Sequence, residues 1–315
     1  MRVLVLTSPE TTEARPDTAD TLLQAEEIAT CLRGLGHEPA IVPFQVNRLI
    51  AALDGIDPHL VFNLVEDVPE GPDQVYLATD FLDQRGIPFT GASTQALRRL
   101  GNKPLMKARL RDAGLPVAPG LGEAAPNARF IVKSATEHAS VGLTADNVVS
   151  GAGAALLKIA EREHALGGEW FAEAYIDGRE FNVALLEDGS VAPLVLPIAE
   201  IVFADHVGDA PRIVGYAEKW ATESHAYAAT PRTFPPHEEP LFPELQRLAV
   251  AAWDAFALTG YARVDFRVDR DGRPFILEIN ANPCLAADAG FCAAAARHGL
   301  GQVDIVARLL AATDA

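Results

Sequence analysis

The feature that most restricts the fold of this chain is a pair of strand-like runs near its C-terminal end. Residues 263–268 and 274–280 each alternate between apolar and polar side chains, and Asp271-Gly272 lies between them. An Asp-Gly pair in this setting is a strong signal for a hairpin with a two-residue turn, because such a turn needs positive φ angles. We therefore predict an antiparallel hairpin with Asp271 and Gly272 as its turn.

One face of the predicted hairpin is polar. A two-residue turn places Asp265 opposite Glu278 and Arg263 opposite Asn280, all on the same face. Two carboxylates opposed at about 5 Å destabilise a sheet unless a positive charge lies between them. Two carboxylates and an amide offer only oxygen ligands, which suit Mg²⁺ better than zinc. The alternative is an exposed hairpin with solvated acids. The opposite, apolar face is predicted to contact the core through Val264, Phe266, Leu277 and Ile279.

The charge balance of the chain limits its partners. The 315 residues carry a formal net charge of -17, so no general attraction to nucleic acid or to an anionic membrane is expected. A hydrophobic content of 49% is ample for two or three packed domains. Three cysteines without metal-ligand spacing indicate a reducing compartment. The residues after Met1 include no apolar segment suited to export or membrane insertion, and we expect a cytoplasmic protein.

The first 98 residues alternate between short apolar runs and amphipathic stretches. Residues 3–6, 40–42 and 60–62 have the composition of strands. A helix between the first two is predicted from the spacing of Leu22, Ala25, Ala29 and Leu32. This βαβ alternation is typical of a small parallel α/β domain. A helix at about 73–84 and a short strand within 86–91 are predicted to follow.

The remaining residues predict two α+β parts. The first begins with a helix from residue 103 to about 114 and contains strands at 130–133 and 171–175. The second contains strands at 181–186 and 194–203, followed by an irregular polar stretch to about 240. A helix then precedes the hairpin, and its buried face is predicted to be Leu245, Leu248, Ala252 and Phe256. Two short helices end the chain.

A motif in the hairpin resembles a known enzyme family. The pattern R-x-D followed by E-x-N-x-x-P is matched by Arg263, Asp265, Glu278, Asn280 and Pro283, as in D-alanine:D-alanine ligase and its ATP-grasp relatives. The resemblance runs in order along most of the chain. It implies an α/β protein with the ATP-grasp fold, in which a Rossmann-like parallel domain precedes two α+β subdomains that clasp ATP. On this interpretation residues 1–98 form the N-terminal domain, 99–177 the central subdomain and 178–315 the C-terminal subdomain with the metal site.

The resemblance also implies roles for the hairpin residues. Asp265, Glu278 and Asn280 resemble the Mg²⁺ ligands, with Glu278 bridging two ions. Arg263 resembles the residue that steadies an acyl phosphate, and Leu277 falls among the residues that contact the nucleotide. The implied cofactors are ATP and two Mg²⁺ ions, with Mn²⁺ as an alternative.

Four side chains elsewhere resemble the family's phosphate-binding elements. Lys103 begins a helix and Lys133 ends an apolar strand, and both resemble lysines that reach the ATP phosphates. The loop 137–142, which contains Ser140, resembles a small-residue loop that closes over the phosphates, where backbone N–H groups bind anions. Lys219 resembles the lysine that contacts the γ-phosphate and the growing acyl phosphate.

Residues 173–180 resemble the family hinge E-x-x-[IL]-x-G-x-E. The resemblance implies that the backbone of Glu173, Ala174 and Ile176 hydrogen-bonds the adenine edge. It also implies that Glu180 accepts hydrogen bonds from the ribose hydroxyls. An ordinary strand, turn and strand is the alternative for this stretch taken alone.

The segments expected to contact substrate depart from the family pattern. Glu10 or Glu13 lies where the family has a glutamate that binds the amino group of the first substrate, and Glu66 lies where it has a histidine. The segment that replaces the family's acceptor loop lacks the usual serine and offers Asn282, Cys284 and Asp288. D-alanine is therefore not expected on either side.

Three acids after the third predicted strand, Glu66, Asp67 and Glu70, suggest a substrate with a cationic group. A solvated acidic loop is the alternative.

These features predict an ATP-dependent ligase that joins a carboxylate to an amine through an acyl phosphate and releases ADP and phosphate. Its substrates would be amino acids or similar small molecules, and a homodimer is left open. One alternative is an ATP-grasp enzyme that uses a non-amino-acid acceptor or stops at the acyl phosphate. The other is a nucleotide-binding protein without catalysis.

Overall fold

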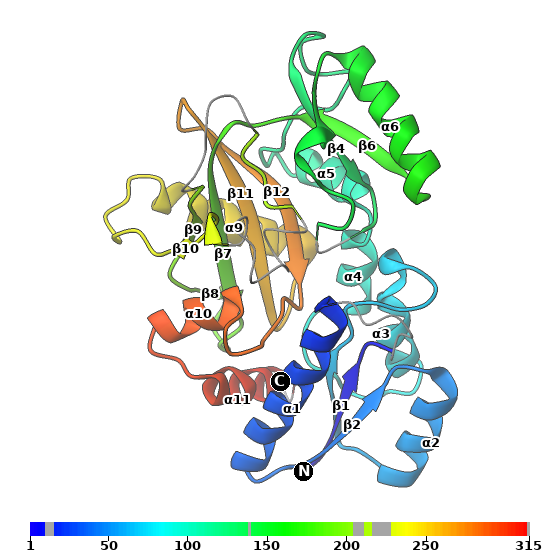
Figure 1. The fold of residues 1–315 in the computed structure, drawn as a ribbon. Coiled ribbons are helices and arrows are strands. Elements are labelled where there is room, and N and C mark those ends of the chain that lie inside the picture. Colours follow the sequence, from blue (N-terminus) through cyan, green and yellow to red (C-terminus); the bar gives the residue numbers. More distant parts are fainter. Residues whose placement is uncertain (10–15, 138–139, 204–210, 216–227, 314–315) are drawn as a thin grey trace.

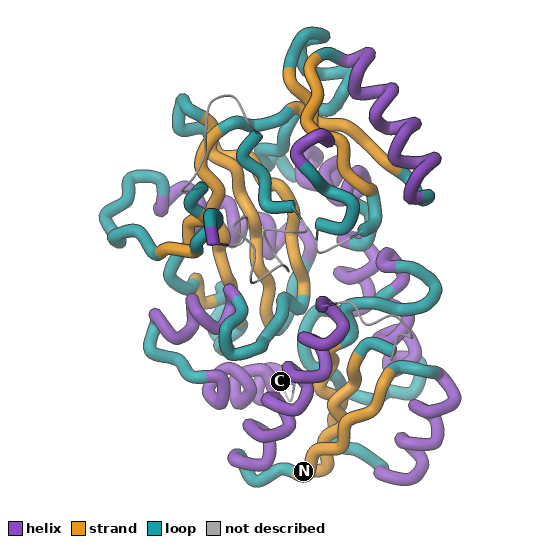
Figure 2. Tube along the Cα trace, in the orientation of Figure 1, coloured by secondary structure: helices purple, strands orange, loops and turns teal. Residues whose placement is uncertain are grey.

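The computed structural model describes residues 1–9, 16–137, 140–203, 211–215 and 228–313. Three β-sheets follow one another along the chain and form the framework of the molecule (Figures 1 and 2). The first is parallel and the other two are antiparallel. The predicted α/β class, with α+β parts after the N-terminal sheet, is therefore confirmed.

The N-terminal sheet has the strand order β2-β1-β3. Its strands are β1 (Arg2–Thr7), β2 (Glu38–Pro43) and β3 (Leu60–Leu64). Its helices are α1 (Pro16–Gly34), α2 (Val46–Ile56) and α3 (Tyr76–Asp83), with the 3₁₀ turn η1 (Pro72–Gln74) before α3. The central strand is buried on both sides: Val3 and Val5 pack with α1, whereas Leu4 and Leu6 pack with α2 and α3. This two-sided burial explains the uninterrupted apolar run.

The helix predicted between the first two strands is confirmed as α1, in which Ala25, Ala29 and Leu32 are buried and Leu22 is 49% exposed. One detail of the N-terminal prediction was wrong. Residues 86–91 form no strand; they make only an isolated bridge between Phe89 and Val61. Pro88 lies beside this bridge and has no amide N–H to continue a strand ladder.

The central sheet has the order β5-β4-β6 and is reached through two helices. The helices are α4 (Thr94–Leu100) and α5 (Lys103–Asp112), and the strands are β4 (Arg129–Ser134), β5 (Val148–Ser150) and β6 (Trp170–Ala174). The 3₁₀ turn η2 (Ala145–Asn147) and helix α6 (Ala152–Leu166) complete this part. Its small core consists mainly of Phe130, Val132, Ala155, Trp170 and Ala172.

The C-terminal sheet has the order β10-β9-β7-β11-β12, with β8 paired to β7. Its strands are β7 (Gly178–Leu186), β8 (Leu194–Val195), β9 (Ala199–Ile201), β10 (Arg232–Thr233), β11 (Tyr261–Asp269) and β12 (Pro274–Ala281). The strand predicted at 194–203 is split into β8 and β9, and Pro197 lies in the gap. The helices of this part are α9 (Phe242–Phe256), α10 (Gly290–Arg297) and α11 (Gln302–Thr313).

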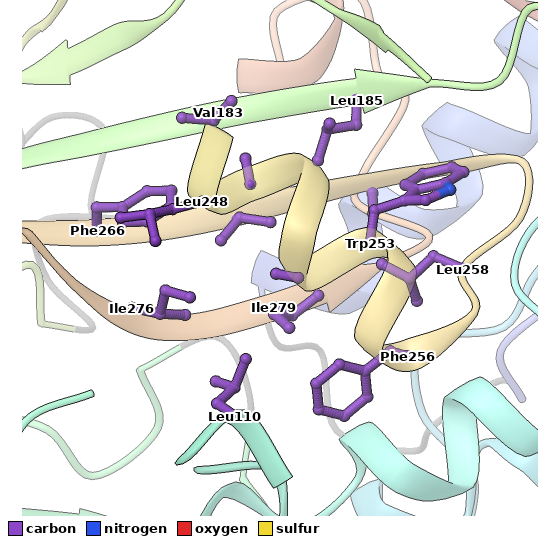
Figure 3. Packing of buried hydrophobic residues seen from close by; sticks show 14 of the residues in the cluster. Leu110, Val183, Leu185, Leu248, Trp253, Phe256, Leu258, Phe266, Ile276 and Ile279 are labelled. Carbon is purple, nitrogen blue, oxygen red and sulfur yellow. The ribbon is translucent and has the colours of Figure 1, made fainter. Parts of the chain in front are cut away.

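Helix α9 covers one face of the C-terminal sheet (Figure 3). The four residues predicted for its buried face, Leu245, Leu248, Ala252 and Phe256, all lie in this core. They pack against Val183 of β7, Phe266 of β11 and Ile276 and Ile279 of β12. Because α9 fills this face, polar side chains on the same strands are left for the opposite face.

The hairpin β11–β12 closes with a longer loop than predicted. Gly272 N–H donates to the Asp269 carbonyl at 3.1 Å and Asp269 N–H donates to the Arg273 carbonyl at 3.0 Å, so three residues, Arg270 to Gly272, form the loop. Gly272 has the positive φ of 79° that such a loop needs at its last position.

The extra loop residue is compensated inside the hairpin. A register shift follows Asp265, so that Phe266 pairs with Ile276 whereas Asp265 pairs with Glu278. The unpaired residue is Leu277, a β-bulge. The predicted opposition of Asp265 and Glu278 is therefore correct, but the predicted core position of Leu277 is wrong, because Ile276 occupies it.

The N-terminal sheet and the C-terminal part are joined by a close contact. A Cβ atom on Gly260 would lie 2.6 Å from the Cα atom of Gly91, and Thr259 donates to the Gly91 carbonyl at 2.8 Å. One hydrophobic core also spans both parts and includes Val5 of β1 and Phe291 of α10. α11 lies beside α1 in Figure 1.

Candidate active site

A large cavity lies where the three sheets meet. Its volume is about 1210 Å³, and residues of all three parts of the chain line it. Seventeen of the residues given a site role from the sequence line this cavity: Glu66, Asp67, Lys103, Lys133, Ser140, Glu173, Ala174, Ile176, Glu180, Arg263, Asp265, Leu277, Glu278, Asn280, Asn282, Cys284 and Asp288. Glu70 is exposed and is not among the residues that line the cavity. Glu10, Glu13 and Lys219 lie outside the described residues.

Two carboxylates in the cavity wall lie close to one side-chain amide. The amide Nδ2 of Asn280 lies 2.9 Å from Asp265 Oδ2 and 3.5 Å from Glu278 Oε1. One atom placed where this nitrogen lies is therefore within reach of both carboxylates. This closeness follows from the pairing of Asp265 with Glu278 on adjacent strands. The described residues contain no group of three or more His, Cys, Asp or Glu side chains placed to hold a metal. A cation at this point would use the two carboxylates and, with the Asn280 amide turned so that its oxygen faces them, that oxygen as well. Such a set of oxygen ligands fits Mg²⁺.

Asp265 is held by several donors. Arg263 donates to it from Nε at 2.7 Å and from Nη2 at 2.8 Å, and Asn182 Nδ2 donates at 2.7 Å. Burial disfavours the charge of Arg263, but the attraction and hydrogen bonds of Asp265 outweigh it and raise the pKa of the guanidinium. Asn182 was missed in the sequence. It lies directly opposite Asp265 on β7, a pairing that only the sheet order reveals.

Lysines gather at the end of the cavity next to the central sheet. Lys103 N–H donates to the Ala135 carbonyl at 2.8 Å, and its Nζ donates to the Glu137 carbonyl. Lys133 Nζ lies 2.8 Å from Glu173 Oε1. The Glu173 side chain is only 2% exposed. The lysine pair predicted for phosphate binding is thus brought to one wall.

A third lysine in this group escaped the sequence prediction. Lys107 Nζ lies 2.7 Å from Glu173 Oε2, and its side chain is 3% exposed. Burial alone would raise the pKa of Glu173, but Lys107 and Lys133 together lower it. Lys107 lies four residues after Lys103, on the same face of α5, and this spacing was the available signal.

Glu180 also has a buried partner. Its carboxylate lies 3.1 Å from the Arg267 guanidinium, which donates further to the Gly178 carbonyl at 3.1 Å. Arg267 lines the cavity and is 4% exposed. The alternation that placed Arg263 and Asp265 on the polar face extends to Arg267 and could have identified it.

The loop predicted to cover the phosphates reaches across the cavity. Ser140 Oγ donates to the Val214 carbonyl at 2.8 Å, which links the central part to the C-terminal part. Ser140 has a positive φ of 62°, uncommon for a residue with a side chain, and Gly142 follows with 69°. Residues 138 and 139 of this loop lie outside the described residues.

Away from the central sheet the cavity wall carries three acids, Glu66, Asp67 and Asp288. Arg232 lines the same wall, and its Nη1 donates to the Asp288 carbonyl at 3.3 Å. The N–H groups of Glu66 and Asp67 donate to Ser8 Oγ at 2.9 and 3.0 Å, which fixes this turn beside β1.

Gln24 of α1 connects this acidic turn to the loop after the hairpin. Its Nε2 donates to Glu66 Oε1 at 3.3 Å, and its Oε1 accepts from the N–H of Leu285. Gln24 is 1% exposed. It was missed because its helix position looks like an ordinary polar one until the fold brings these segments together.

Asn282 has a structural contact in addition to its place in the cavity wall. It is 5% exposed, and its Oδ1 accepts from the Ala92 N–H at 2.9 Å. A Cβ atom on Gly91 would lie 2.3 Å from this oxygen. The predicted substrate role of Asn282 therefore competes with its contact to the N-terminal part.

Comparisons with known proteins agree with this arrangement. Residues 126–311 match the family described as the D-Ala–D-Ala ligase C-terminus. The chain belongs to this family. A D-alanine–D-alanine ligase from Cupriavidus metallidurans is 29% identical over 91% of this chain and 91% of its own length. An uncharacterized protein, y4sG, from Sinorhizobium fredii is 30% identical over 87% of this chain and 82% of its own length.

The fold is that of the D-Ala–D-Ala ligase family over the full length. The crystal structure of D-alanine–D-alanine ligase from Bacillus anthracis complexed with ATP matches with a TM-score of 0.73 and 19% identity. The match covers 99% of this chain and 97% of that chain. The ligase from Coxiella burnetii matches with the same TM-score. The predicted ATP-grasp fold is thus confirmed. Among the described helices, none has the length and apolar character needed to cross a membrane.

Proposed function

We propose that this protein is an ATP-dependent, ADP-forming ligase that joins a carboxylate to an amine through an acyl phosphate. The observation that carries the proposal is the convergence of Asp265 and Glu278 within 3.5 Å of one amide nitrogen, inside a cavity whose adjacent wall carries Lys103 and Lys133. The similar ligase from Bacillus anthracis has been crystallised with ATP.

The nucleotide would lie along the central sheet. Lys103 and Lys133 would contact its phosphates, and Glu180 would accept from the ribose. The N–H groups of Ala174 and Tyr175 already donate to the carbonyls of Pro119 and Arg129 at 2.8 and 2.9 Å. We therefore assign the adenine contact to the N–H of Ile176.

The reaction needs two anions to meet. A carboxylate oxygen of the substrate attacks the γ-phosphorus, and the bond from this phosphorus to the bridging oxygen of ADP breaks. Positive charge from Lys133 and Arg263 would lower the repulsion. Asp265, Glu278 and Asn280 would hold Mg²⁺, which would supply further neutralisation. Arg263, which lies against Asp265 in the same wall, would also steady the acyl phosphate.

The second step forms the product bond. The amine nitrogen attacks the acyl carbon, the carbon–oxygen bond to phosphate breaks, and the nitrogen loses a proton. The link between Ser140 and Val214 across the cavity would help to exclude water, which would otherwise hydrolyse the acyl phosphate.

For the carboxylate substrate we propose an amino acid or similar compound that carries a cationic group near its far end. Glu66, Asp67 and Asp288 line that end of the cavity, and a cation would be attracted by them. Glu66 is oriented by Gln24, so its carboxylate is held at the wall.

The test is a matrix of carboxylates and amines, assayed for ADP release with mass spectrometry of the products. We expect ADP release to need both a carboxylate and an amine, with the highest kcat/KM for a carboxylate bearing a second cationic group. ADP release without any amine would contradict ligation. Strict use of D-alanine on both sides would contradict the cationic substrate while leaving ligation intact.

A further inference from the structure

A buried group of three charges lies beneath the phosphate-binding wall. The two oxygens of Glu173 lie 2.8 Å from Lys133 Nζ and 2.7 Å from Lys107 Nζ. Lys107 and Glu173 are almost fully buried, whereas Lys133 is 17% exposed and reaches the cavity. Only one of the three charges is therefore presented to a ligand.

The charge balance of this group decides what Lys133 can offer. Glu173 and Lys133 alone would form a neutral pair, and a neutral pair attracts polyphosphate weakly. With Lys107 present the group has two ammonium ions and one carboxylate, a net charge of +1. Buried charges are screened less than surface charges. The difference between a net charge of zero and one of +1 therefore changes the attraction of this group for the phosphates.

Lys107 also spans two parts of the molecule. It belongs to α5, it pairs with Glu173 of β6, and its Nζ donates to the carbonyl of Ile276 on β12 at 3.4 Å. Ile276 directly precedes the bulge at Leu277, which is followed by Glu278. Burial lowers the pKa of Lys107, and the negative charge of Glu173 opposes that shift. Glu173 therefore helps to keep Lys107 in its ammonium form.

We propose that Lys107 is a positioning residue for the nucleotide: it neutralises Glu173 so that Lys133 keeps its positive charge for the ATP phosphates. The inference rests on the proposed function, because it assumes that the phosphates lie at Lys133. Lys107 itself does not contact the nucleotide.

The experiment compares nucleotide affinity in three purified proteins: wild type, Lys107→Met, and the double variant Lys107→Met with Glu173→Gln. Isothermal titration calorimetry with a non-hydrolysable ATP analogue and Mg²⁺ gives Kd without any need for turnover. Lys107→Met leaves a neutral group, and we expect its Kd to rise by about 10-fold or more. The double variant regains a net charge of +1 through Lys133, and we expect its Kd to return to within about threefold of wild type.

The double variant separates positioning from simple structural support. If Lys107 only filled space, removing a second buried charge would not restore binding. Lys158→Met is the matched control, because Lys158 lies on α6 of the same subdomain and pairs with Asp146 and Glu161 away from the cavity. We expect its Kd to be unchanged, and thermal melting reports whether each variant is folded.

Two results would overturn the inference alone: a Kd for Lys107→Met equal to that of wild type, or a double variant that binds no better than Lys107→Met. A wild-type protein that fails to bind the nucleotide would instead overturn the proposed function. The two failures are therefore distinguishable in one set of titrations.

Discussion

The two ends of the cavity are built differently. At the nucleotide end the charged side chains are buried and paired with one another, as Glu173 is with Lys107 and Lys133 and as Glu180 is with Arg267. At the substrate end the acids lie on turns and are partly or fully exposed, among them Glu66, Asp67 and Asp288. Replacing one member of a buried pair leaves an uncompensated charge, whereas an exposed acid on a turn can change at little cost to folding.

The contrast parallels the resemblance seen in the sequence. Glu173 and Glu180, where the sequence resembles the family pattern, lie on strands, whereas Glu66 and Asp288, where it departs from that pattern, lie on loops. Ligase specificity can then change without disturbing ATP binding. If the two ends are independent, a substitution at one end should leave the kinetics of the other end unchanged.

Glu278→Gln keeps the shape of the side chain but removes one of the two converging charges. We expect kcat to fall by roughly 10³-fold or more, because the neutral amide is a poor cation ligand. Folding should be little affected, since Glu278 lies in the cavity wall. The measurement is steady-state ADP release, with thermal melting in parallel. Glu244→Gln, at a surface ion pair on α9, is the control. Wild-type-like ADP release by Glu278→Gln would rule out the metal assignment.

Glu66→Gln tests the substrate end alone. If the carboxylate substrate carries a cationic group, we expect its kcat/KM to fall by roughly 10- to 100-fold, the loss typical of a charged hydrogen bond. KM for ATP should stay the same. Glu70→Gln is a closely matched control, because Glu70 is exposed and lies outside the cavity wall. Equal losses for cationic and neutral substrates would contradict the role of Glu66 in substrate choice.

Gln24→Leu removes the side chain that links the acidic turn to the loop after the hairpin. The N–H of Leu285 would lose its acceptor in a buried position, which costs about 1–3 kcal/mol of unfolding free energy. We expect a several-fold rise in KM for the carboxylate or the amine and no change for ATP. Denaturant unfolding and initial-rate kinetics measure both effects. Gln84→Leu, at an exposed helix end, is the control, and a raised KM for ATP would argue against separate ends.

Asp269→Asn affects the hairpin loop and has the smallest expected effect, about 1 kcal/mol at neutral pH. Burial raises the pKa of Asp269, but hydrogen bonds from Arg273 and Asp271 outweigh it, and the net pKa lies below the model-peptide value of 3.8. Its contribution to stability is therefore present above about pH 4 and is lost as pH falls below its folded-state pKa. The stability difference between wild type and variant should shrink toward pH 2. Asp271→Asn, at a more exposed position in the same loop, should show a smaller difference at every pH.

The hairpin shows how a partly wrong premise led to a correct pairing. The Asp-Gly signal located the turn, but the sequence does not distinguish a two-residue turn from a three-residue loop that ends in glycine. The bulge at Leu277 restores the predicted opposition of Asp265 and Glu278. The same bulge takes the Leu277 side chain off the core face of the sheet. No local pattern in residues 274–280 revealed this bulge.

The other missed residues differ in how accessible they were to prediction. Arg267 follows from strand alternation and Lys107 from helical spacing, so both could have been found by extending patterns already in use. Asn182 and Gln24 could not, because each acts on a partner far away in the sequence that only the folded chain brings near. The broad fold was predictable because its apolar periodicities are local.

The contact between Gly91 and Gly260 has a consequence for how a nucleotide enters. Because these two backbones lie so close and a hydrophobic core is shared, we expect the N-terminal sheet and the C-terminal sheet to move as one body. The central sheet has a small core of its own. We therefore expect the central sheet to be the part that moves when a nucleotide enters. A bulkier residue at position 91 or 260 would then disturb the contact between the N-terminal and C-terminal sheets and not this movement.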